Sequence, residues 1–284
     1  MRNGILIIDK EKDITSRDVV NALCRKFGTK KIGHTGTLDP IATGVLVLGI
    51  NEGTKLIEFL MSDEKEYIAE VLIGVETDTL DVTGKVISEK QVSLEETTIK
   101  NALLSFVGSY EQEVPKYSAV HVDGKRLYEY ARSDEEVNLP KRKLEIREIE
   151  LLEVKKNAFT FRVVVSKGSY IRSLIRDIGT FLGVACCMKN LRRTRQGIFA
   201  KDRAKKLDEV SEQDILPLIS GLENYPKYVV EDEDLFKVLN GAKLKKDYSV
   251  PCTMVDSNNN LLAIYENAKE EGYIKPKKVF RNNL

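Results

Sequence analysis

The sequence predicts an α+β fold, in which a sheet flanked by helices is followed by a small, mainly β C-terminal domain. Apolar residues alternate with other residues in 67–75 and 159–165, which is the period of a half-buried strand. In 16–27 and 171–182 they recur at helical spacing instead. The last part, 222–284, has one helical stretch followed by short apolar runs.

The length of 284 residues suggests about two domains. We expect a large domain at 1–220 and a small, compact domain at 222–284. The stretch 208–226 is rich in loop-forming residues and is the candidate linker between them.

The N-terminal elements follow from local patterns. The expected elements up to residue 75 are a strand at 5–9, a helix at 16–27, a strand at 45–50, a short helix at 54–61 and a strand at 67–75. Ser16 is the expected N-cap of the first helix, and Gly28 ends it.

The polar segment 76–86 carries three acids, Glu76, Asp78 and Asp81. Three acids suggest a metal loop, but their spacing does not complete an EF-hand, so a turn between strands is the favoured interpretation. The residues SLEE at 93–96 then predict a capping box that opens a helix ending near Gly108.

The stretch 112–143 has little periodicity, two prolines and interleaved charges and tyrosines. We interpret it as a long excursion from the sheet, and long ordered loops are usually functional. Further on, SKGSYIRSL at 166–174 is a strand-to-helix junction, where backbone amides face ligands. A helix is expected near 233–240, closed by Gly241.

Composition narrows the class of protein. The chain is 42% hydrophobic and 31% charged, with no stretch approaching the roughly 20 apolar residues that cross a bilayer. The N-terminal residues lack the pattern of a secretory signal. We therefore expect a cytoplasmic protein that does not bind membranes.

A net charge of +1 argues against coating of nucleic acid by bulk charge. Between 186 and 206, however, eight cations stand against Asp202 alone. They are Lys189, Arg192, Arg193, Arg195, Lys201, Arg203, Lys205 and Lys206. A solvated helix face is the ordinary explanation, but the imbalance favours a phosphate-binding surface.

A metal site is not expected. The four cysteines have no Cys-x-x-Cys spacing, and the only histidines are His34 and His121. Cys186 and Cys187 lie in an apolar context and are interpreted as buried reduced thiols, because adjacent cysteines rarely have the geometry of a relaxed disulfide. A redox pair is the alternative.

Asp39 is the strongest candidate for chemistry. It lies in GHTGTLDPIATG, and Pro40 disfavours helical backbone at the residue before it. Tyr67 opens a strand and Arg172 lies at the strand-to-helix junction, so all three stand near element ends, where sites are built. A turn aspartate, a core tyrosine and a surface arginine are the ordinary interpretations, and the residues alone leave the choice open.

The string GHTGTLDPIATGVLVLGI resembles the signature of the TruB family of tRNA pseudouridine synthases. Further matching strings follow in the family's order over about the first 220 residues. They are IDKEKDITSRDVV, EGTK, KEYIAEV, YSAVHVDGKRLYEYAR, SKGSYIRSL and LRRTRQGIF.

The resemblance implies the pseudouridine synthase fold, with a mixed, mainly antiparallel central sheet flanked by helices. It makes Asp39 the catalytic aspartate that allows the glycosidic bond of uridine to move from nitrogen to carbon. It makes Arg172 the ion-pair partner of Asp39 and Tyr67 the tyrosine that stacks on the flipped base, with proton transfer as a weaker second role. A guanidinium keeps a buried carboxylate charged and oriented.

Substrate-binding roles are implied for six further residues. His34 corresponds to the histidine that fills the vacated base stack, a general base or core histidine being the alternatives, and Tyr170 to a residue lining the uracil pocket. Lys55 corresponds to a lysine near the active site, with a structural role as alternative. The set is completed by Asp81, Arg192 and Arg193.

The expected reaction is formation of pseudouridine at position 55 of the tRNA T loop after base flipping. The implied partner is the T arm of tRNA, which the 112–143 loop would grip; no cofactor, no obligate protein partner and a monomer are expected. The alternatives are an RNA-binding tRNA folding factor with dispensable catalysis and a guide-RNA-dependent relative. Residues 222–284 faintly resemble a short PUA domain, an RNA-binding fold.

Three positions in two segments depart from the family pattern. Glu11 and Asp13 stand where proline and glycine are usual, which puts the path of that loop in question. In EVPKYSA, one proline precedes the tyrosine where a pair is common.

Overall fold

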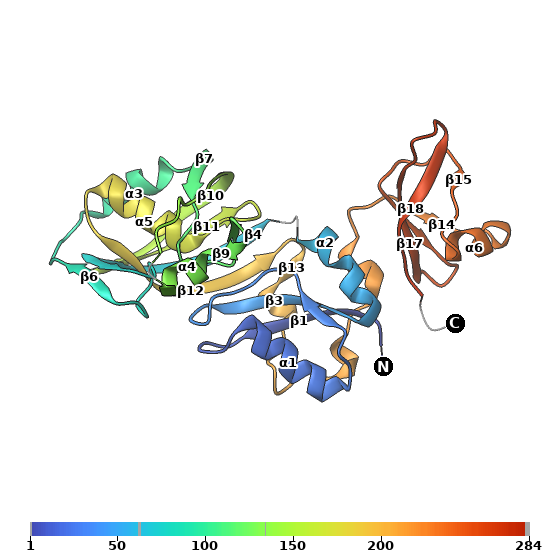
Figure 1. Ribbon diagram of the computed structural model, residues 1–284, viewed down its shortest axis with the longest axis horizontal. Coiled ribbons are helices and arrows are strands. Elements are labelled where there is room, and N and C mark those ends of the chain that lie inside the picture. The colour runs from blue at the N-terminus through green and yellow to red at the C-terminus, as the bar shows by residue number, and fades with distance from the viewer. Residues whose placement is uncertain (1, 62–63, 134, 282–284) are drawn as a thin grey trace.

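The computed structural model describes residues 2–61, 64–133 and 135–281. Its centre is a nine-stranded sheet in the order β1-β3-β12-β4-β11-β10-β7, with β2 beside β3 and β13 beside β12 (Figure 1). The strands are β1 Gly4–Lys10, β2 Ile32–His34, β3 Thr43–Ile50, β4 Lys65–Ile73, β7 Gly108–Glu113, β10 Lys141–Lys155, β11 Ala158–Val165, β12 Cys186–Gln196 and β13 Phe199–Ala200. Among these described strands only β3 and β12 pair in parallel, so the expected mixed, mainly antiparallel sheet is confirmed.

Helices cover one face of this sheet. They are α1 Ser16–Phe27, α3 Glu96–Leu104 and α5 Ile171–Leu182, and their apolar residues join one core cluster with the strands. In β1, Leu6 and Ile8 point into this cluster, whereas Ile5 and Ile7 belong to a second cluster on the opposite face. Burial on both faces explains why β1 and β3 are continuous apolar runs.

Two expected helix caps are wrong. The N-cap of α1 is Thr15, not Ser16, because Thr15 exchanges hydrogen bonds with Asp18 in a capping box. The SLEE box does not form either, since α3 begins after Glu95 and has no side-chain cap. The expected stop at Gly28 is confirmed by its left-handed φ of 63°.

Between 51 and 89 the structure refines the expected elements. The expected helix at 54–61 is a 3₁₀ turn, η1 Asn51–Leu56, continued by α2 Ile57–Leu60. The strand expected at 67–75 breaks after β4 at Gly74, which has a φ of 84°. The segment 76–86 is confirmed as a turn, which joins β5 Val75–Thr77 to β6 Val86–Glu89.

The expected excursion leaves the sheet between β7 and β10, which pair with each other. It contains a small hairpin and a helix, β8 His121–Val122, β9 Lys125–Arg126 and α4 Leu127–Ser133. Val114, Leu127 and Tyr130 give it a small core of its own.

The C-terminal part forms a five-stranded sheet in the order β14-β16-β17-β18-β15, set apart from the main sheet (Figure 1). Its elements are β14 Lys227–Val229, α6 Asp232–Leu239, β15 Leu244–Lys245, β16 Cys252–Val255, β17 Leu261–Asn267 and β18 Tyr273–Val279. In the part of the chain that is described, no helix is long and apolar enough to cross a membrane.

The stretch expected as a linker is instead largely packed. Three short 3₁₀ turns, Lys201–Arg203, Glu212–Asp214 and Leu218–Gly221, lead from the main sheet towards the C-terminal part. Leu216 exchanges backbone hydrogen bonds with Ile5, and Leu218 and Leu222 are buried. The chain therefore stays attached to the main fold as far as Leu222.

Candidate active site

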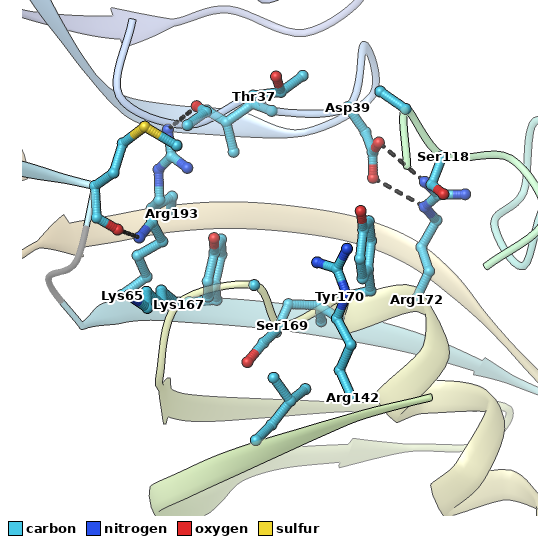
Figure 2. Close-up of a pocket in the computed structure, with 18 of the residues that line it drawn as sticks. Thr37, Asp39, Lys65, Ser118, Arg142, Lys167, Ser169, Tyr170, Arg172 and Arg193 are labelled. Atoms are coloured by element: carbon cyan, nitrogen blue, oxygen red, sulfur yellow. Dashed lines mark hydrogen bonds and ion pairs between the residues drawn. The ribbon is translucent and has the colours of Figure 1, made fainter. Parts of the chain in front are cut away.

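A cavity of about 990 Å³ opens where three segments meet, the loop 35–39, the excursion at 117–119 and the junction 167–172. Asp39, Tyr67, Tyr170, Arg172 and Arg193 all line it, so the structure brings together five of the expected site residues. Figure 2 shows Asp39 and Arg172 facing each other across its upper end.

Asp39 and Arg172 form a two-pronged ion pair. The Nε of Arg172 donates to Oδ2 of Asp39 at 2.9 Å, and its Nη2 donates to Oδ1 at 3.1 Å. Arg172 is 5% exposed, whereas the Asp39 side chain keeps 33% of its surface open to the cavity. The arginine is thus a fixed support, and the carboxylate is the member of the pair that a substrate can reach.

Two further carbonyls hold the guanidinium. Nη1 donates to the Thr79 oxygen at 2.9 Å and Nη2 to the Tyr117 oxygen at 3.0 Å. A planar guanidinium with this many partners has one orientation, so Arg172 aims Asp39 as well as pairing with it. The turn 78–84 and the excursion therefore both contribute to the geometry of the ion pair.

Residues 10–14, at the end of β1 and in the loop that follows it, support the Asp39 loop. Lys10 is buried, and its Nζ donates to the carbonyl oxygens of Glu11, Ile14 and Pro40 at 2.8, 2.6 and 3.1 Å. The Asp13 N–H donates to the same Pro40 oxygen at 2.9 Å. Burial lowers the pKa of Lys10 to about 8, while the charge of Asp39 opposes that shift.

Lys10 and Ser16 were not expected at the site from sequence. Ser16 is buried, and its Oγ accepts from the Leu38 N–H at 2.9 Å, next to Asp39. The available signals were a lysine at the end of an apolar strand and a serine at the start of a helix, because both are costly to bury without partners.

Arg193 supports the loop from the other side. It is 1% exposed and donates to the carbonyl oxygens of Val45 at 2.6 Å and Gly36 at 3.0 Å. It lines the cavity but is not a surface cation. Arg192 lies outside the cavity lining and is paired with both carboxylate oxygens of Asp9, at 3.0 and 2.7 Å.

The structure divides the cations of 186–206, the stretch expected to form a phosphate-binding surface. Its first half is strand β12, which places cations beside the acids of neighbouring strands, such as Lys189 against Glu70 at 2.8 Å. The cations that line the cavity come mostly from elsewhere, from Lys65, Arg142, Lys143 and Lys167. Figure 2 shows Lys65, Lys167 and Arg193 across the cavity from the Asp39–Arg172 pair.

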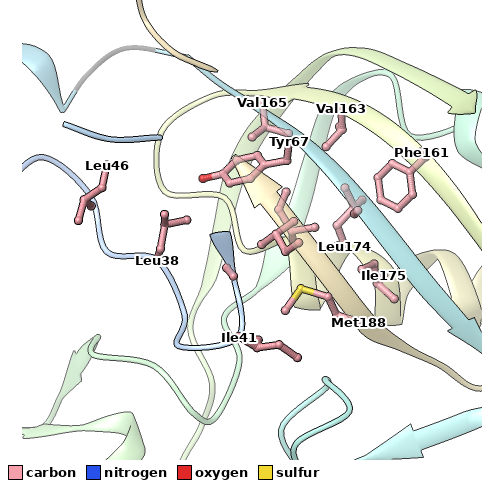
Figure 3. Packing of buried hydrophobic residues seen from close by; sticks show 14 of the residues in the cluster. Leu38, Ile41, Leu46, Tyr67, Phe161, Val163, Val165, Leu174, Ile175 and Met188 are labelled. Atoms are coloured by element: carbon pink, nitrogen blue, oxygen red, sulfur yellow. The ribbon is translucent and has the colours of Figure 1, made fainter. Parts of the chain in front are cut away.

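Tyr67 is 6% exposed and belongs to the main core cluster. Figure 3 shows its ring at the edge of that cluster near Val165, with the hydroxyl pointing away from Phe161 towards the loop that carries Leu38. A ring held on one side by apolar residues and open to a cavity on the other provides a flat surface for a base.

His34 lies at the end of β2, just before the lining residue Thr35. Burial lowers its pKa, and the charges of Arg193 and Arg17 lower it further, so His34 is neutral at pH 7. Its buried Nδ1 has no hydrogen-bond partner within the described residues. A neutral ring suits stacking better than it suits a cationic phosphate contact.

Like Arg192, two further expected site residues lie outside the cavity lining. The Nζ of Lys55 bonds Glu52 at 2.6 Å and the Val279 oxygen at 2.8 Å, so Lys55 joins η1 to the C-terminal part, away from the cavity. Asp81 is buried, and its Oδ1 accepts from the Thr79 hydroxyl and the Thr83 N–H, both at 2.9 Å. It shapes the turn that presents the Thr79 oxygen to Arg172, and it does not line the cavity.

Cys186 and Cys187 are free and buried, as expected, and burial raises the pKa of Cys187 to about 11. Among the described residues, no three histidine, cysteine, aspartate or glutamate side chains group so that they could hold a metal ion.

Comparison with known proteins decides the family. Residues 24–171 match the model of the TruB family pseudouridylate synthase N-terminal domain. The chain belongs to the TruB family. Residues 172–218 match the tRNA pseudouridylate synthase B C-terminal domain. The chain is therefore a pseudouridine synthase, an enzyme of the isomerase class.

Curated relatives agree over nearly the full length. The tRNA pseudouridine synthase B of Oceanobacillus iheyensis is 41% identical over 295 residues, covering 98% of this chain and 97% of the relative. That of Alkaliphilus oremlandii is 40% identical over 253 residues, covering 87% and 85%.

Solved structures show the same fold. An H/ACA RNP bound to a substrate RNA containing 2'-deoxyuridine has a chain that matches with a TM-score of 0.74 at 25% identity, over 98% of this chain and 84% of that one. A Cbf5-Nop10-Gar1 complex matches with a TM-score of 0.74 at 26% identity, over 97% and 84%. The pseudouridine synthase fold is confirmed.

Proposed function

We propose that this enzyme converts uridine to pseudouridine at position 55 in the T loop of tRNA, with Asp39 as nucleophile on a flipped-out base. The observation that carries this proposal is the ion pair of Asp39 with Arg172 at the end of a cavity that Tyr67 also lines. The names of the relatives, tRNA pseudouridine synthase B, support tRNA as the substrate.

The reaction is an isomerisation, so atoms and electrons balance without a cofactor. The bond from ribose C1' to uracil N1 breaks, a bond from C1' to C5 forms, C5 loses a proton and N1 gains one. Asp39 is the nucleophile that assists this exchange, and Arg172 pairs with its carboxylate and aims it. The enzyme should stay active in excess chelator.

Access to the base requires flipping, because a uridine inside a folded RNA arm is unreachable. In the proposal Tyr67 stacks on the extruded uracil and Tyr170 lines its pocket. The neutral ring of His34 fills the vacated stack, and Arg142, Lys143 and Lys167 at the cavity meet the RNA backbone.

We further propose that 1–220 is the catalytic domain and 222–284 a short PUA-like RNA-binding domain. The excursion at 112–143 would grip the T arm. The protein would act as a cytoplasmic monomer without an obligate protein partner.

The test is incubation of the protein alone with an unmodified tRNA transcript, followed by mapping of pseudouridine. Wild type should modify the T-loop uridine, and Asp39→Asn should form no product while still binding the transcript. Asp208→Asn, which changes an exposed aspartate that does not line the cavity, is the matched control and should retain the rate. Product at another position would refute the T-loop assignment.

The transcript assay and a genetic test separate the alternative functions. Activity with no RNA other than the transcript excludes dependence on a guide RNA. Full rescue of a deletion strain by Asp39→Asn would instead support an RNA-binding folding factor with dispensable catalysis.

A further inference from the structure

Gln112 is a buried polar residue that the proposed mechanism does not use. It lies on β7, one residue before the chain leaves the sheet for the excursion, and it is 2% exposed. A buried amide is costly unless its donors and acceptor are paired, so its partners show what it holds in place.

Those partners are the backbone groups of Tyr170. The Tyr170 N–H donates to Oε1 of Gln112 at 2.8 Å, and Nε2 of Gln112 donates to the Tyr170 oxygen at 3.0 Å. One side chain therefore grips both polar groups of one residue, as a neighbouring strand would. Tyr170 is also the N-cap of α5, which has no side-chain cap of its own.

A second set of bonds fixes the amide. Nε2 also donates to the Tyr110 hydroxyl at 2.9 Å, and that hydroxyl donates to Oδ2 of Asp177 on α5 at 2.7 Å. Because the carboxylate accepts only, the Tyr110 oxygen must receive its bond from an N–H of Gln112. The amide orientation is thus determined, and Gln112 is anchored to α5 at two points.

We propose that Gln112 is a positioning residue for α5. It holds Tyr170 in the cavity wall and thereby also holds Arg172, two residues further along the chain, against Asp39. A helix turn is rigid, so a shift at Tyr170 is carried to the guanidinium that aims Asp39. The excursion that begins after Gln112 returns at Tyr117, whose oxygen accepts from Arg172 at 3.0 Å. Gln112 and Tyr117 therefore join the start of the excursion to Tyr170 and Arg172, at the N-terminal end of α5.

The informative variant is Gln112→Glu, which has the same shape but carries an ionised carboxylate with no donor. At pH 8 the oxygens of Tyr170 and Tyr110 would each face an acceptor, and the single-turnover rate at saturating enzyme should fall about 10- to 100-fold. The dissociation constant for tRNA should stay within about threefold, because phosphates carry most of the affinity.

The pH dependence of the variant's rate distinguishes a lost hydrogen bond from a general loss of packing. Burial raises the pKa of a carboxyl, and protonation of the carboxyl introduced by Gln112→Glu would restore one O–H donor to this network. The variant's rate should therefore recover towards pH 6, relative to wild type at the same pH. The titratable and charged groups around this position are Tyr110, Glu113, Arg142, Tyr170, Arg176 and Asp177, and they are the same in both proteins.

Tyr110→Phe, which removes one of the two Nε2 acceptors, should lower the rate by less. Glu111→Gln, an exposed neighbour on the same strand, is the control and should match wild type. Wild-type rates for Gln112→Glu at pH 8, or a loss that follows melting or tRNA affinity alone, would overturn the inference.

The inference rests on the proposed roles of Tyr170 and Arg172. A wild type that forms no pseudouridine refutes the proposed function, whereas an active wild type matched by its Gln112 variants refutes this inference alone.

Discussion

At the level of single residues, substitution of Arg172 should affect catalysis but not tRNA binding. Arg172→Ala removes both bonds to Asp39 and frees the carbonyls of Thr79 and Tyr117. We expect turnover to fall by at least about 100-fold, as when a group that stabilises charge in a transition state is removed.

The tRNA dissociation constant of Arg172→Ala should change by less than about threefold, because the arginine is 5% exposed and cannot supply a main phosphate contact. Arg25→Ala, an exposed arginine on α1, is the control. Filter binding and single-turnover assays on the same preparations distinguish the two effects, and equal losses in both would contradict an aiming role.

Lys10 predicts an alkaline limit to the reaction. Its pKa is lowered from 10.5 to about 8, so Lys10 is charged below pH 8 and becomes neutral above it. The neutral amine lacks one of the three protons it donates to carbonyls, so it holds the Asp39 loop less firmly. The single-turnover rate should therefore fall as the pH rises through about 8.

Lys10→Met provides the comparison for this pH profile. It should be slower at pH 7, since the Pro40 oxygen loses a donor, and it should lack the alkaline fall. The two proteins are compared from about pH 6.5 to about pH 9.5 at saturating enzyme. Parallel profiles would show that the fall has another origin.

At the level of elements, the loop between β1 and α1 shows how the chain accommodates Asp13, a residue that stands where glycine was expected. Asp13 adopts a φ of 65°, the left-handed region that favours glycine and that aspartate tolerates. Its N–H still reaches the Pro40 oxygen at 2.9 Å. Aspartate at position 13 therefore still supports the Asp39 loop.

This geometry predicts opposite outcomes for two substitutions. Asp13→Gly should retain the melting temperature and the rate, whereas Asp13→Val should lose about 1–2 kcal/mol of stability and react more slowly, because β-branched residues avoid this conformation. Lys12→Val, at the exposed neighbour, is the control. Equal melting temperatures for the two valine variants would contradict the argument.

Elements with a strong period were predicted well, but the N-terminal caps of two helices were not. The alternation in β4 and β11 and the stripe of α5 are properties of local sequence, and they were confirmed. Whether Thr15 or Ser16 caps α1 depends on which side chain meets a free N–H, and Ser16 is used by Leu38 from another segment. Cap positions of this kind are decided by tertiary contacts.

For the whole molecule, the C-terminal part is held by an apolar contact under β1 and η1. Leu261, Ile264 and Phe280 join the cluster that contains Ile5 and Leu56. Phe280 is fully buried, and the Lys55 ammonium lies 5.9 Å from its ring centroid. This contact explains why Lys55 is distant from the cavity.

Phe280→Ala should lower the free energy of unfolding by about 3–5 kcal/mol, the usual range for removal of a buried phenylalanine side chain. The single-turnover rate of the folded variant should be unchanged, because Phe280 does not line the cavity. Phe236→Ala, a residue 77% exposed on α6, should stay within about 0.5 kcal/mol of wild type. Denaturant titration measures both, and similar stabilities would show that the contact contributes little.

The sequence by itself determined the helices and strands with a clear period, the reduced buried cysteines, the Asp39 loop and, through ordered motifs, the family. It could not tell which cations are free, because Arg192 and Arg193 look alike in the chain while one pairs with Asp9 and the other is buried under the loop. Nor could it find Lys10 or Gln112, whose partners lie up to 58 residues away. Burial and pairing are properties of side chains that meet across segments, so only the tertiary structure decided what surrounds Asp39.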